Sequence, residues 1–193
     1  MNFYPVNTPI PEKLQTNELL IVPLTPAHVE LDYAALMDNK KMLRLWSGSP
    51  WPTDNFTLNE NLDDLEWHWD EHQKRIAFTY TVLSPTEDTC LGCVYIKSFA
   101  EILANNEDWE TAVSDYNALV RYWAVKPTLT YRLDKILLDA LRQWFASEWA
   151  FTGVYWHTPI NNQQQIDLFQ TNELEELGHI HLPDRGGTHI LFK

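Results

Sequence analysis

Hydrophobic residues recur along the chain with two different spacings, and each spacing predicts a different kind of element. Short runs rich in β-branched, aromatic and aliphatic residues, separated by turn residues, predict strands. These runs cover residues 19–24, 78–83, 90–97, 116–125, 154–158, 174–182 and 188–192. The turn residues at 84–89, between the second and third runs, predict an antiparallel hairpin.

Amphipathic segments that follow N-terminal caps predict the first helices. Thr25 and Pro26 open a helix that continues to about Met37, because a hydroxyl cap and a proline at the first helical position both favour a helix start. Thr57 and Glu60 form a capping box, in which a hydroxyl and a carboxylate bond each other's backbone N–H groups. The second helix behind this box presents one apolar face, made of Leu58, Leu62, Leu65 and Trp69.

The order of the elements predicts the fold class. Antiparallel strands come first, and a strand–helix–strand unit follows, with a helix from about residue 133 to 144 between strands 116–125 and 154–158. That helix packs one apolar face on a sheet, and a shorter helix is expected at 163–169. The prediction is a mixed α+β fold with a mostly antiparallel sheet flanked by helices. The length of 193 residues predicts one domain over 1–193, with 1–17 as an N-terminal extension.

Charge excludes several classes of partner. The chain carries 27 acidic and 14 basic side chains, a formal net charge of −13. Nucleic-acid binding relies on Lys and Arg to neutralise phosphates, so neither a nucleic acid nor an anionic membrane surface is an expected partner. No apolar run is long enough to span a membrane, and the first residues lack a basic region followed by an apolar one. A cytoplasmic location is therefore expected, and no oligomeric state is predicted.

Two motifs that could bind a metal are interpreted as structural. Cys90 and Cys93 form a CxxC motif, but zinc would need a second pair of ligands and no second CxxC exists. The motif lies in a predicted hairpin, so buried, reduced thiols are expected. His68 and His72 are four residues apart on the second helix, but no third ligand is placed beside them, and no metal site is predicted.

Four segments, in this order and at this spacing, resemble the GNAT N-acetyltransferase superfamily over about residues 18–193. Leu20–Pro26 is similar to the opening strand and helix cap, and Cys90–Tyr95 to the third strand, with Gly92 at the usual glycine. Val125–Pro127 matches the strand end before the family's pyrophosphate loop. The most specific match is Asn162–Phe169, an asparagine, a short helix and then an aromatic residue.

The resemblance implies an activity and a fold. GNAT enzymes transfer the acetyl group of acetyl-CoA to the primary amine of a small molecule or a protein N-terminus. Their central strands splay apart, so that the pantetheine arm pairs with exposed main chain. The chemistry needs a base to remove the ammonium proton and an acid to protonate the departing thiolate.

The resemblance also implies site residues. Main-chain N–H groups near Val125 would polarise the acyl carbonyl, and Asn162 would contact the cofactor. The CoA diphosphate would bind at Thr130, Tyr131, Arg132 and Leu133, with the Arg132 cation as counter-ion. From the residues alone, two plainer alternatives stay open: an ordinary helix start with solvated cations after residue 128, and a helix N-cap at Asn162.

Three positions depart from the GNAT pattern. The loop before the third large helix contains no glycine, and Tyr131 and Leu133 lie near the expected glycines. Phe169 stands where many members have a tyrosine acid, and phenylalanine cannot donate a proton. No carboxylate lies within 119–125, where the family often has its base, so Asp115 is the nearest candidate base, with a turn residue as the alternative.

These departures leave three functional hypotheses. The first is an acetyl-CoA-dependent N-acetyltransferase. The second is a non-catalytic GNAT-like interaction module with a degenerate CoA site, and the third is a variant that uses another acyl or aminoacyl donor. Tryptophans at 46, 51, 67 and 69 cluster around the first two helices, on the family's acceptor side. Together with the acidic surface they favour a cationic amine as substrate, unless the rings are simply core.

Overall fold

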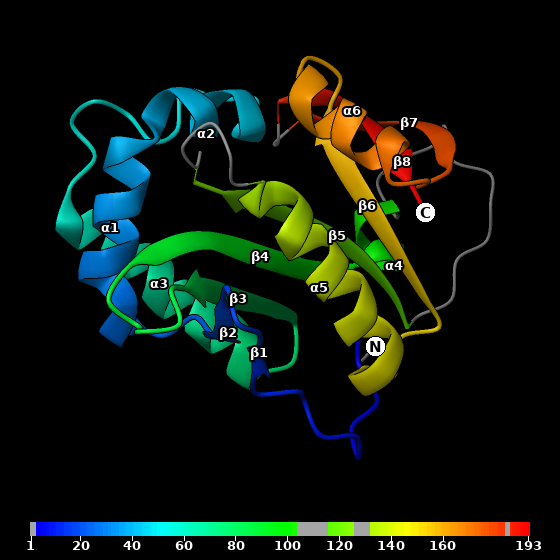
Figure 1. Cartoon of the computed structure of the whole chain (residues 1–193), viewed down its shortest axis with the longest axis horizontal. Helices are drawn as coiled ribbons and strands as arrows, with labels where there is room; N and C mark the ends of the chain where they lie inside the picture. The colour runs from blue at the N-terminus through cyan, green and yellow to red at the C-terminus, as the bar shows by residue number, and fades with distance from the viewer. Residues whose placement is uncertain (1–2, 104–115, 126–131, 184–185) are drawn as a thin grey trace.

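An eight-stranded sheet runs through the centre of the computed structural model, which describes residues 3–103, 116–125, 132–183 and 186–193 (Figure 1). The strands lie in the order β1-β2-β3-β4-β5-β6-β8-β7. Their bounds are β1 Leu14–Gln15, β2 Leu20–Pro23, β3 Ala77–Leu83, β4 Cys90–Ser98, β5 Asn117–Ala124, β6 Gly153–Pro159, β7 Glu176–Leu182 and β8 Gly187–Phe192. All neighbouring strands are antiparallel except β5 and β6, which are parallel. The predicted mixed α+β fold class is confirmed.

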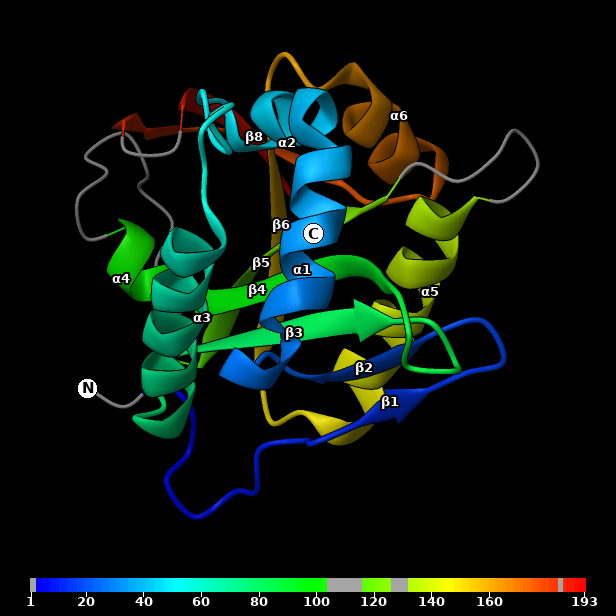
Figure 2. The ribbon, with the colours of Figure 1, turned by 90° about the vertical axis from the view of Figure 1, so that its left-hand side faces the viewer.

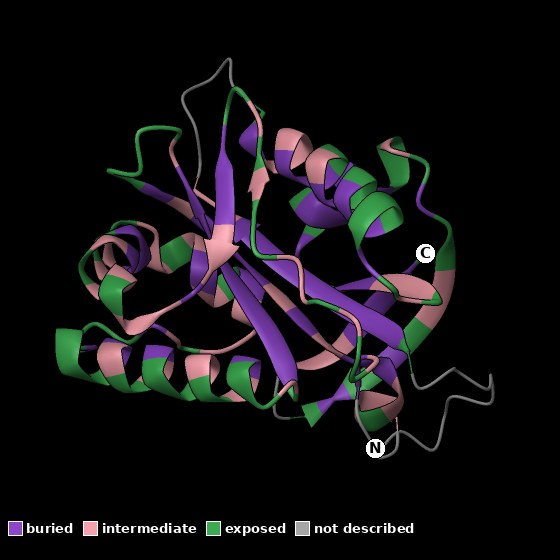
Figure 3. Ribbon diagram, turned by 90° about the horizontal axis from the view of Figure 1, so that it is seen from below, coloured by how far each residue is buried: buried purple, intermediate pink, exposed green. Residues whose placement is uncertain are grey.

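Helices cover both faces of this sheet. They are the short 3-10 helix η1 Pro26–His28 and the α-helices α1 Val29–Asp38, α2 Lys40–Ser47, α3 Leu58–Gln73, α4 Phe99–Leu103, α5 Leu133–Glu148 and α6 Gln163–Thr171. Figure 2 shows α3 and α5 on opposite sides of the strands. The α-helices direct buried residues at the sheet and exposed residues outward, so β3, β4 and β5 in the middle of the sheet are almost wholly buried, whereas β1 and β7 at its edges are partly exposed (Figure 3).

The described residues form two large hydrophobic cores on the two faces of the sheet and a smaller cluster that joins Phe99 of α4 to Leu119 and to residues of β7 and β8. The core beneath α5 joins Leu137 and Trp144 to alternate strand residues such as Tyr80 and Val120. The core beneath α1, α2 and α3 joins Leu36 and other helix residues to strand residues that point the opposite way, such as Cys93 and Trp123. Because successive side chains of a strand point to opposite faces of the sheet, neighbouring residues of one strand contribute to different cores.

The structure adds elements that the hydrophobic pattern did not predict, among them the short helix α4 at residues 99–103. Helix α2 occupies residues 40–47, where only a connection before a proline-rich stretch was expected. Strand β1 pairs with β2 within the predicted N-terminal extension, and Phe3 and Tyr4 are buried in the α5-side core. The extension is thus packed onto the fold, whereas one domain over 1–193 stays a prediction.

Gly92 permits a close approach between β4 and β5. A Cβ atom built on this glycine would lie 2.2 Å from the carbonyl oxygen of Trp123, a main-chain atom that cannot swing aside. The glycine noted in the family resemblance thus has a steric reason here. The thiols of Cys90 and Cys93 in the same strand are buried and unbridged, as expected, and burial raises the pKa of Cys90 to about 12. Among the helices of the described residues, none is long and apolar enough to cross a membrane.

Strands β5 and β6 separate part-way along their length. Their parallel pairing begins at Asn117 with Gly153 and ends at Val120 with Trp156. Both strands then continue, β5 to Ala124 and β6 to Pro159, without pairing to each other. The carboxyl-terminal ends of the two central strands therefore enclose a V-shaped slot in the middle of the sheet.

Candidate active-site cleft

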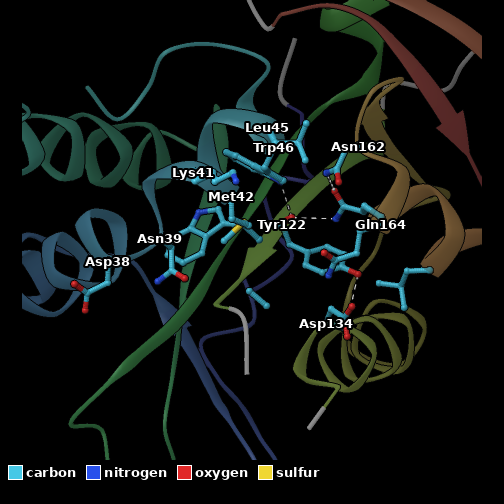
Figure 4. Close-up of a pocket in the computed structure, with 14 residues that line it drawn as sticks. Asp38, Asn39, Lys41, Met42, Leu45, Trp46, Tyr122, Asp134, Asn162 and Gln164 are labelled. Carbon is cyan, nitrogen blue, oxygen red and sulfur yellow. Dashed lines mark hydrogen bonds between the residues drawn. The ribbon is translucent and has the colours of Figure 1, made fainter. Parts of the chain in front are cut away.

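A cavity of about 470 Å³ lies at the open end of the slot between β5 and β6. Its walls come from four places: the end of α1 with α2, residues 122–124 of β5, the start of α5, and the first turns of α6 (Figure 4). Elements distant in the sequence thus converge at the carboxyl end of β5.

The main chain of β5 inside the slot is held by two side chains. The carbonyl oxygen of Tyr122 accepts a hydrogen bond from the indole Nε1 of Trp46 at 2.7 Å and another from Nε2 of Gln165 at 3.2 Å. Both bonds come from helices, α2 and α6, that border the cavity. The Tyr122 carbonyl, which has no strand partner on this side, is satisfied without closure of the slot.

Gln165 also braces the opposite strand. Its Oε1 accepts from the hydroxyl of Thr158 on β6 at 3.0 Å, while its Nε2 reaches Tyr122 on β5. A single buried amide therefore spans the two separated strands and fixes their spacing. The brace was invisible in the sequence, because it joins residues 43 positions apart.

Asn162 lies where the resemblance predicted a cofactor contact. It lines the cavity and is 8% exposed. It occupies the N-cap position of α6, but its side chain makes no capping hydrogen bond and instead donates from Nδ2 to Gln165 Oε1 at 3.2 Å. Asn162 therefore occupies the N-cap position, as the plainer alternative predicted, but its side chain does not cap the helix.

The predicted diphosphate site is described only in part. Thr130 and Tyr131 lie outside the described residues, as does the candidate base Asp115. Leu133 is the first residue of α5, and its side chain is buried in the core, so only its main-chain N–H could serve a phosphate. The exposed Arg132 guanidinium donates from Nε to Asp134 Oδ1 at 3.3 Å, an exposed ion pair that leaves its other nitrogens outward.

A polarising main-chain N–H is expected near Val125, and the N–H of Val125 itself is already bonded within the sheet. Its backbone N–H donates to the carbonyl of Leu91 on β4 at 2.8 Å, which directs it away from the slot. The main-chain N–H and C=O groups of successive strand residues point to alternate sides. Those of the neighbouring Ala124, which lines the cavity, therefore point toward the slot. The expected polarising amide is therefore displaced from Val125.

A tyrosine that the sequence analysis missed stands next to Phe169. The ring of Phe169 is buried and packs against Tyr122, with ring centroids 6.2 Å apart. Tyr122 lines the cavity, and its hydroxyl donates to the carbonyl oxygen of Asp134 at 3.3 Å. Burial raises the pKa of Tyr122 well above its usual value, so this phenol keeps its proton. Only the fold reveals it, since Tyr122 reads as an ordinary strand residue.

The chain was compared with protein-family models, with curated protein sequences and with solved structures. No model of a protein family and no curated protein sequence matches the chain. Solved structures do match it. RimL, the ribosomal L7/L12 alpha-N-protein acetyltransferase, in complex with coenzyme A, superimposes with a TM-score of 0.70 at 15% identity, covering 94% of this chain and 96% of that one. The chain has the GNAT acetyltransferase fold.

Other GNAT-fold structures agree over the same extent. The ribosomal-protein-S5-alanine acetyltransferase of Vibrio fischeri gives a TM-score of 0.70 at 12% identity and covers 94% of this chain and 95% of its own. The microcin C7 self-immunity acetyltransferase MccE, in complex with acetyl-CoA and AMP, gives 0.68 at 13% identity and covers 92% of each chain. The predicted GNAT resemblance is confirmed for the fold, and its splayed strands are β5 and β6.

Proposed function

We propose that this protein is an acetyl-CoA-dependent N-acetyltransferase that acts on a primary amine of a small molecule or a protein N-terminus. The observation that carries the proposal is the end of β5–β6 pairing at Val120 and Trp156, with a cavity of about 470 Å³ beyond it. Neighbours of the same fold with coenzyme A or acetyl-CoA bound support the same choice of donor.

The residues around the slot fit acetyl-CoA. A pantetheine arm entering between β5 and β6 would meet the main chain of residues 122–124, which has no strand partner on that side. The N-terminus of α5 would face the diphosphate with the N–H groups of Leu133 and Asp134, since that of Lys135 is bonded to the Asp134 carboxylate, and Arg132 would add positive charge. Thr130 and Tyr131 belong to the same proposed contact. Asn162 would contact the arm from the α6 side of the cavity.

The orientation of the donor follows from these contacts. With the diphosphate at the start of α5, the arm runs back along β5 toward the apex of the slot at Val120. The thioester then lies near Tyr122, where the indole of Trp46 bonds the strand. When bound, acetyl-CoA supplies an activated acyl group. The Tyr122 hydroxyl, which keeps its proton, would protonate the leaving sulfur in place of the tyrosine missing at Phe169, once it exchanges its hydrogen bond to the Asp134 carbonyl oxygen for one to the sulfur.

Two further parts of the proposal concern the base and the location. Asp115 stays a proposed base. A cytoplasmic location is supported by the unbridged thiols of Cys90 and Cys93, since exported proteins more often pair their cysteines.

One observation favours the alternative of a non-catalytic module. The Tyr122 carbonyl already accepts two side-chain hydrogen bonds, so a donor arm could not use that group without displacing Trp46 or Gln165. Calorimetric titration separates the two functions. Acetyl-CoA should bind with a Kd near or below about 100 μM, and dephospho-CoA serves as the comparison. A Kd above about 1 mM, only some −4 kcal/mol, would contradict the proposal.

Turnover tests the catalytic part. Release of the thiol from acetyl-CoA should depend on added amine, and Tyr122→Phe should lower kcat by roughly 10- to 100-fold while the Kd for acetyl-CoA stays within about threefold. Tyr33→Phe is the matched control, because it also removes one phenol, bonded to the Phe56 carbonyl, outside the cavity. Equal rates for the two variants would rule out Tyr122 as the acid. Substituting longer acyl donors for acetyl-CoA tests the donor-variant hypothesis.

A further inference from the structure

A second cavity, of about 200 Å³, lies on the face of the sheet that α3 covers. Aromatic rings form most of its wall: Trp46, Trp51, Trp67 and Tyr95. Four polar side chains complete it, Asp64 and His68 from α3, Lys97 from β4 and Arg121 from β5. The volume fits a group of about the size of one amino-acid side chain, which is much smaller than a coenzyme.

Trp46 is shared by this cavity and the donor cleft. It lines both, and its indole Nε1 is bonded to Tyr122 at the inner part of the slot. Arg121 precedes Tyr122 in β5, so its side chain points to the opposite face of the sheet from that of Tyr122, where it lines the second cavity. The second cavity therefore adjoins the place where the thioester would lie under the proposed function, but from the other side of the sheet.

The two cations of the second cavity are engaged by the protein. Nζ of Lys97 lies 3.5 Å from Glu71 Oε2 and 4.9 Å from the ring centre of Trp67. The Arg121 guanidinium stacks on the Trp46 ring at 4.0 Å and donates to the Trp46 carbonyl oxygen at 2.6 Å. Both cations are therefore bound to groups of the protein in the cavity wall, and we do not assign either of them as the group that binds a ligand.

Asp64 differs from these cations. It is half-buried on the cavity wall and makes no hydrogen bond or ion pair with any residue in the described part of the chain. Burial, together with the nearby charges of Asp63 and Glu60, raises the pKa of its carboxyl, and the neighbouring His68 offsets this only in part. A cationic group in the cavity would compensate the charge of Asp64, and the surrounding rings would favour it as well.

His68 lies one helical turn after Asp64 and is held in a defined orientation. Its Nδ1 is 3.2 Å from the hydroxyl of Thr79 and 3.8 Å from Glu71 Oε2. The role of a base requires the neutral tautomer in which Nδ1 carries the proton and donates it to the Thr79 hydroxyl, an oxygen that can accept. The lone pair is then on Nε2, the nitrogen of a cavity-lining ring that is free of these two partners.

We propose that the second cavity is the acceptor pocket, which binds a compact primary amine as its ammonium ion against Asp64, and that His68 is the base that deprotonates it. This rests on the proposed function and names its substrate class: small alkylamines and diamines, or the N-terminal residue of a peptide. The ammonium gives one proton to Nε2 of His68. The neutral nitrogen forms a C–N bond with the acyl carbon, the C–S bond breaks, and the second proton lost by nitrogen ends on the sulfur as CoA thiol.

The experiment uses paired substitutions on the full chain. Asp64→Asn is compared with Asp63→Asn, which makes the same charge change on the same helix at an exposed residue outside the cavity. His68→Gln is compared with His179→Gln, an exposed histidine on β7. For each protein, acetyl-CoA binding is measured by calorimetry and amine-dependent thiol release by steady-state kinetics, with butylamine, putrescine and a neutral tripeptide as probes.

The expected results separate binding from catalysis. Asp64→Asn should raise the KM for the amine by about tenfold or more, with little change in kcat, as loss of a charged contact predicts. His68→Gln should lower kcat by roughly 100-fold with little change in the KM for the amine, as loss of a general base predicts.

Failure of the inference and failure of the proposed function give different results. A wild-type protein that does not bind acetyl-CoA contradicts the proposed function. If the wild type binds acetyl-CoA but turns over none of the probes, or if Asp64→Asn and His68→Gln behave like their controls, the acceptor pocket is wrong and the donor site stands. Unchanged acetyl-CoA affinity in all four variants excludes a general loss of folding.

Discussion

At the residue scale, the buried carboxyl of Asp32 is the side chain that most clearly limits stability. It lies in the core between α1, α3 and the sheet, where Nδ2 of Asn61 donates to it at 3.0 Å. Burial, opposed by that hydrogen bond and reinforced by the charge of Asp64, raises its pKa from 3.8 to about 6. Since the ionised form is the one that burial penalises, this acid opposes folding at neutral pH.

The sign of the pH effect follows from proton binding. Between about pH 4 and pH 6 the folded protein holds a proton on Asp32 that the unfolded chain releases, so the free energy of unfolding falls as pH rises through this window. Each pKa unit corresponds to about 1.4 kcal/mol, and the ionised carboxylate therefore costs the fold about 3 kcal/mol at pH 7.5.

Asp32→Asn should remove this cost while its amide oxygen still accepts from Asn61. We expect the variant to gain stability over the wild type at pH 7.5, by up to about 3 kcal/mol, and to lose most of that advantage at pH 4.5. Urea unfolding at the two pH values measures both differences. An advantage of equal size at both pH values would show that packing, and not ionisation, separates the two proteins.

At the element scale, Gln165 has a testable structural role. Its amide joins β5, β6 and α6 through Tyr122, Thr158 and Asn162. Gln165→Leu keeps a side chain of similar size but leaves several buried polar groups without this partner. The free energy of unfolding should fall by about 1–3 kcal/mol, and the Kd for acetyl-CoA should rise because the slot loses its fixed width.

Gln163→Leu is the matched control for that prediction. It lies on the same helix two residues earlier, is exposed, and its amide bonds only the exposed Asp167 at 2.7 Å among the described residues. Thermal unfolding and calorimetry on both variants give the comparison. If Gln165→Leu unfolded and bound acetyl-CoA like Gln163→Leu, the brace would have no energetic role in keeping the strands apart.

Elements also show how far the sequence could predict this protein. The capping box at Thr57 and Glu60 predicted the start of α3, and the structure contains both of its hydrogen bonds, because a cap is a local interaction. Helix α2 was missed because it has no side-chain cap at Asn39 and adjoins a proline-rich stretch, so no local signal marks its start. Helix starts that depend on interactions between residues close in the sequence can be predicted from the sequence alone.

The site residues were harder to predict for the opposite reason. The contact of Trp46 with Tyr122 joins positions 76 residues apart, and nothing near either residue indicates it. Asn162 was found because the GNAT resemblance carries its position. The polarising N–H expected near Val125 could not be assigned to one residue, because strand pairing commits the N–H of Val125 itself to Leu91. The direction of a main-chain group depends on register, which the sequence pattern does not specify at one-residue precision.

At the scale of the whole molecule, the net charge of −13 acts on donor and acceptor in opposite senses. A cationic amine is attracted toward the protein, whereas the phosphates of acetyl-CoA are repelled everywhere except near local cations such as Arg132. Steering of this kind works over about a Debye length, which is roughly 10 Å at 0.1 M salt, and is screened at higher ionic strength.

The two substrates should therefore respond differently to salt. Raising the salt concentration from about 20 mM to about 500 mM should lower kcat/KM for putrescine, a dication, by several-fold more than for butylamine, a monocation, at saturating acetyl-CoA. Steady-state kinetics at fixed pH make the comparison, and the monoamine controls for general effects of salt on the enzyme. Equal salt dependence for the two amines would mean that the acidic surface does not guide the acceptor, and that Asp64 alone, inside the pocket, accounts for any preference for cations.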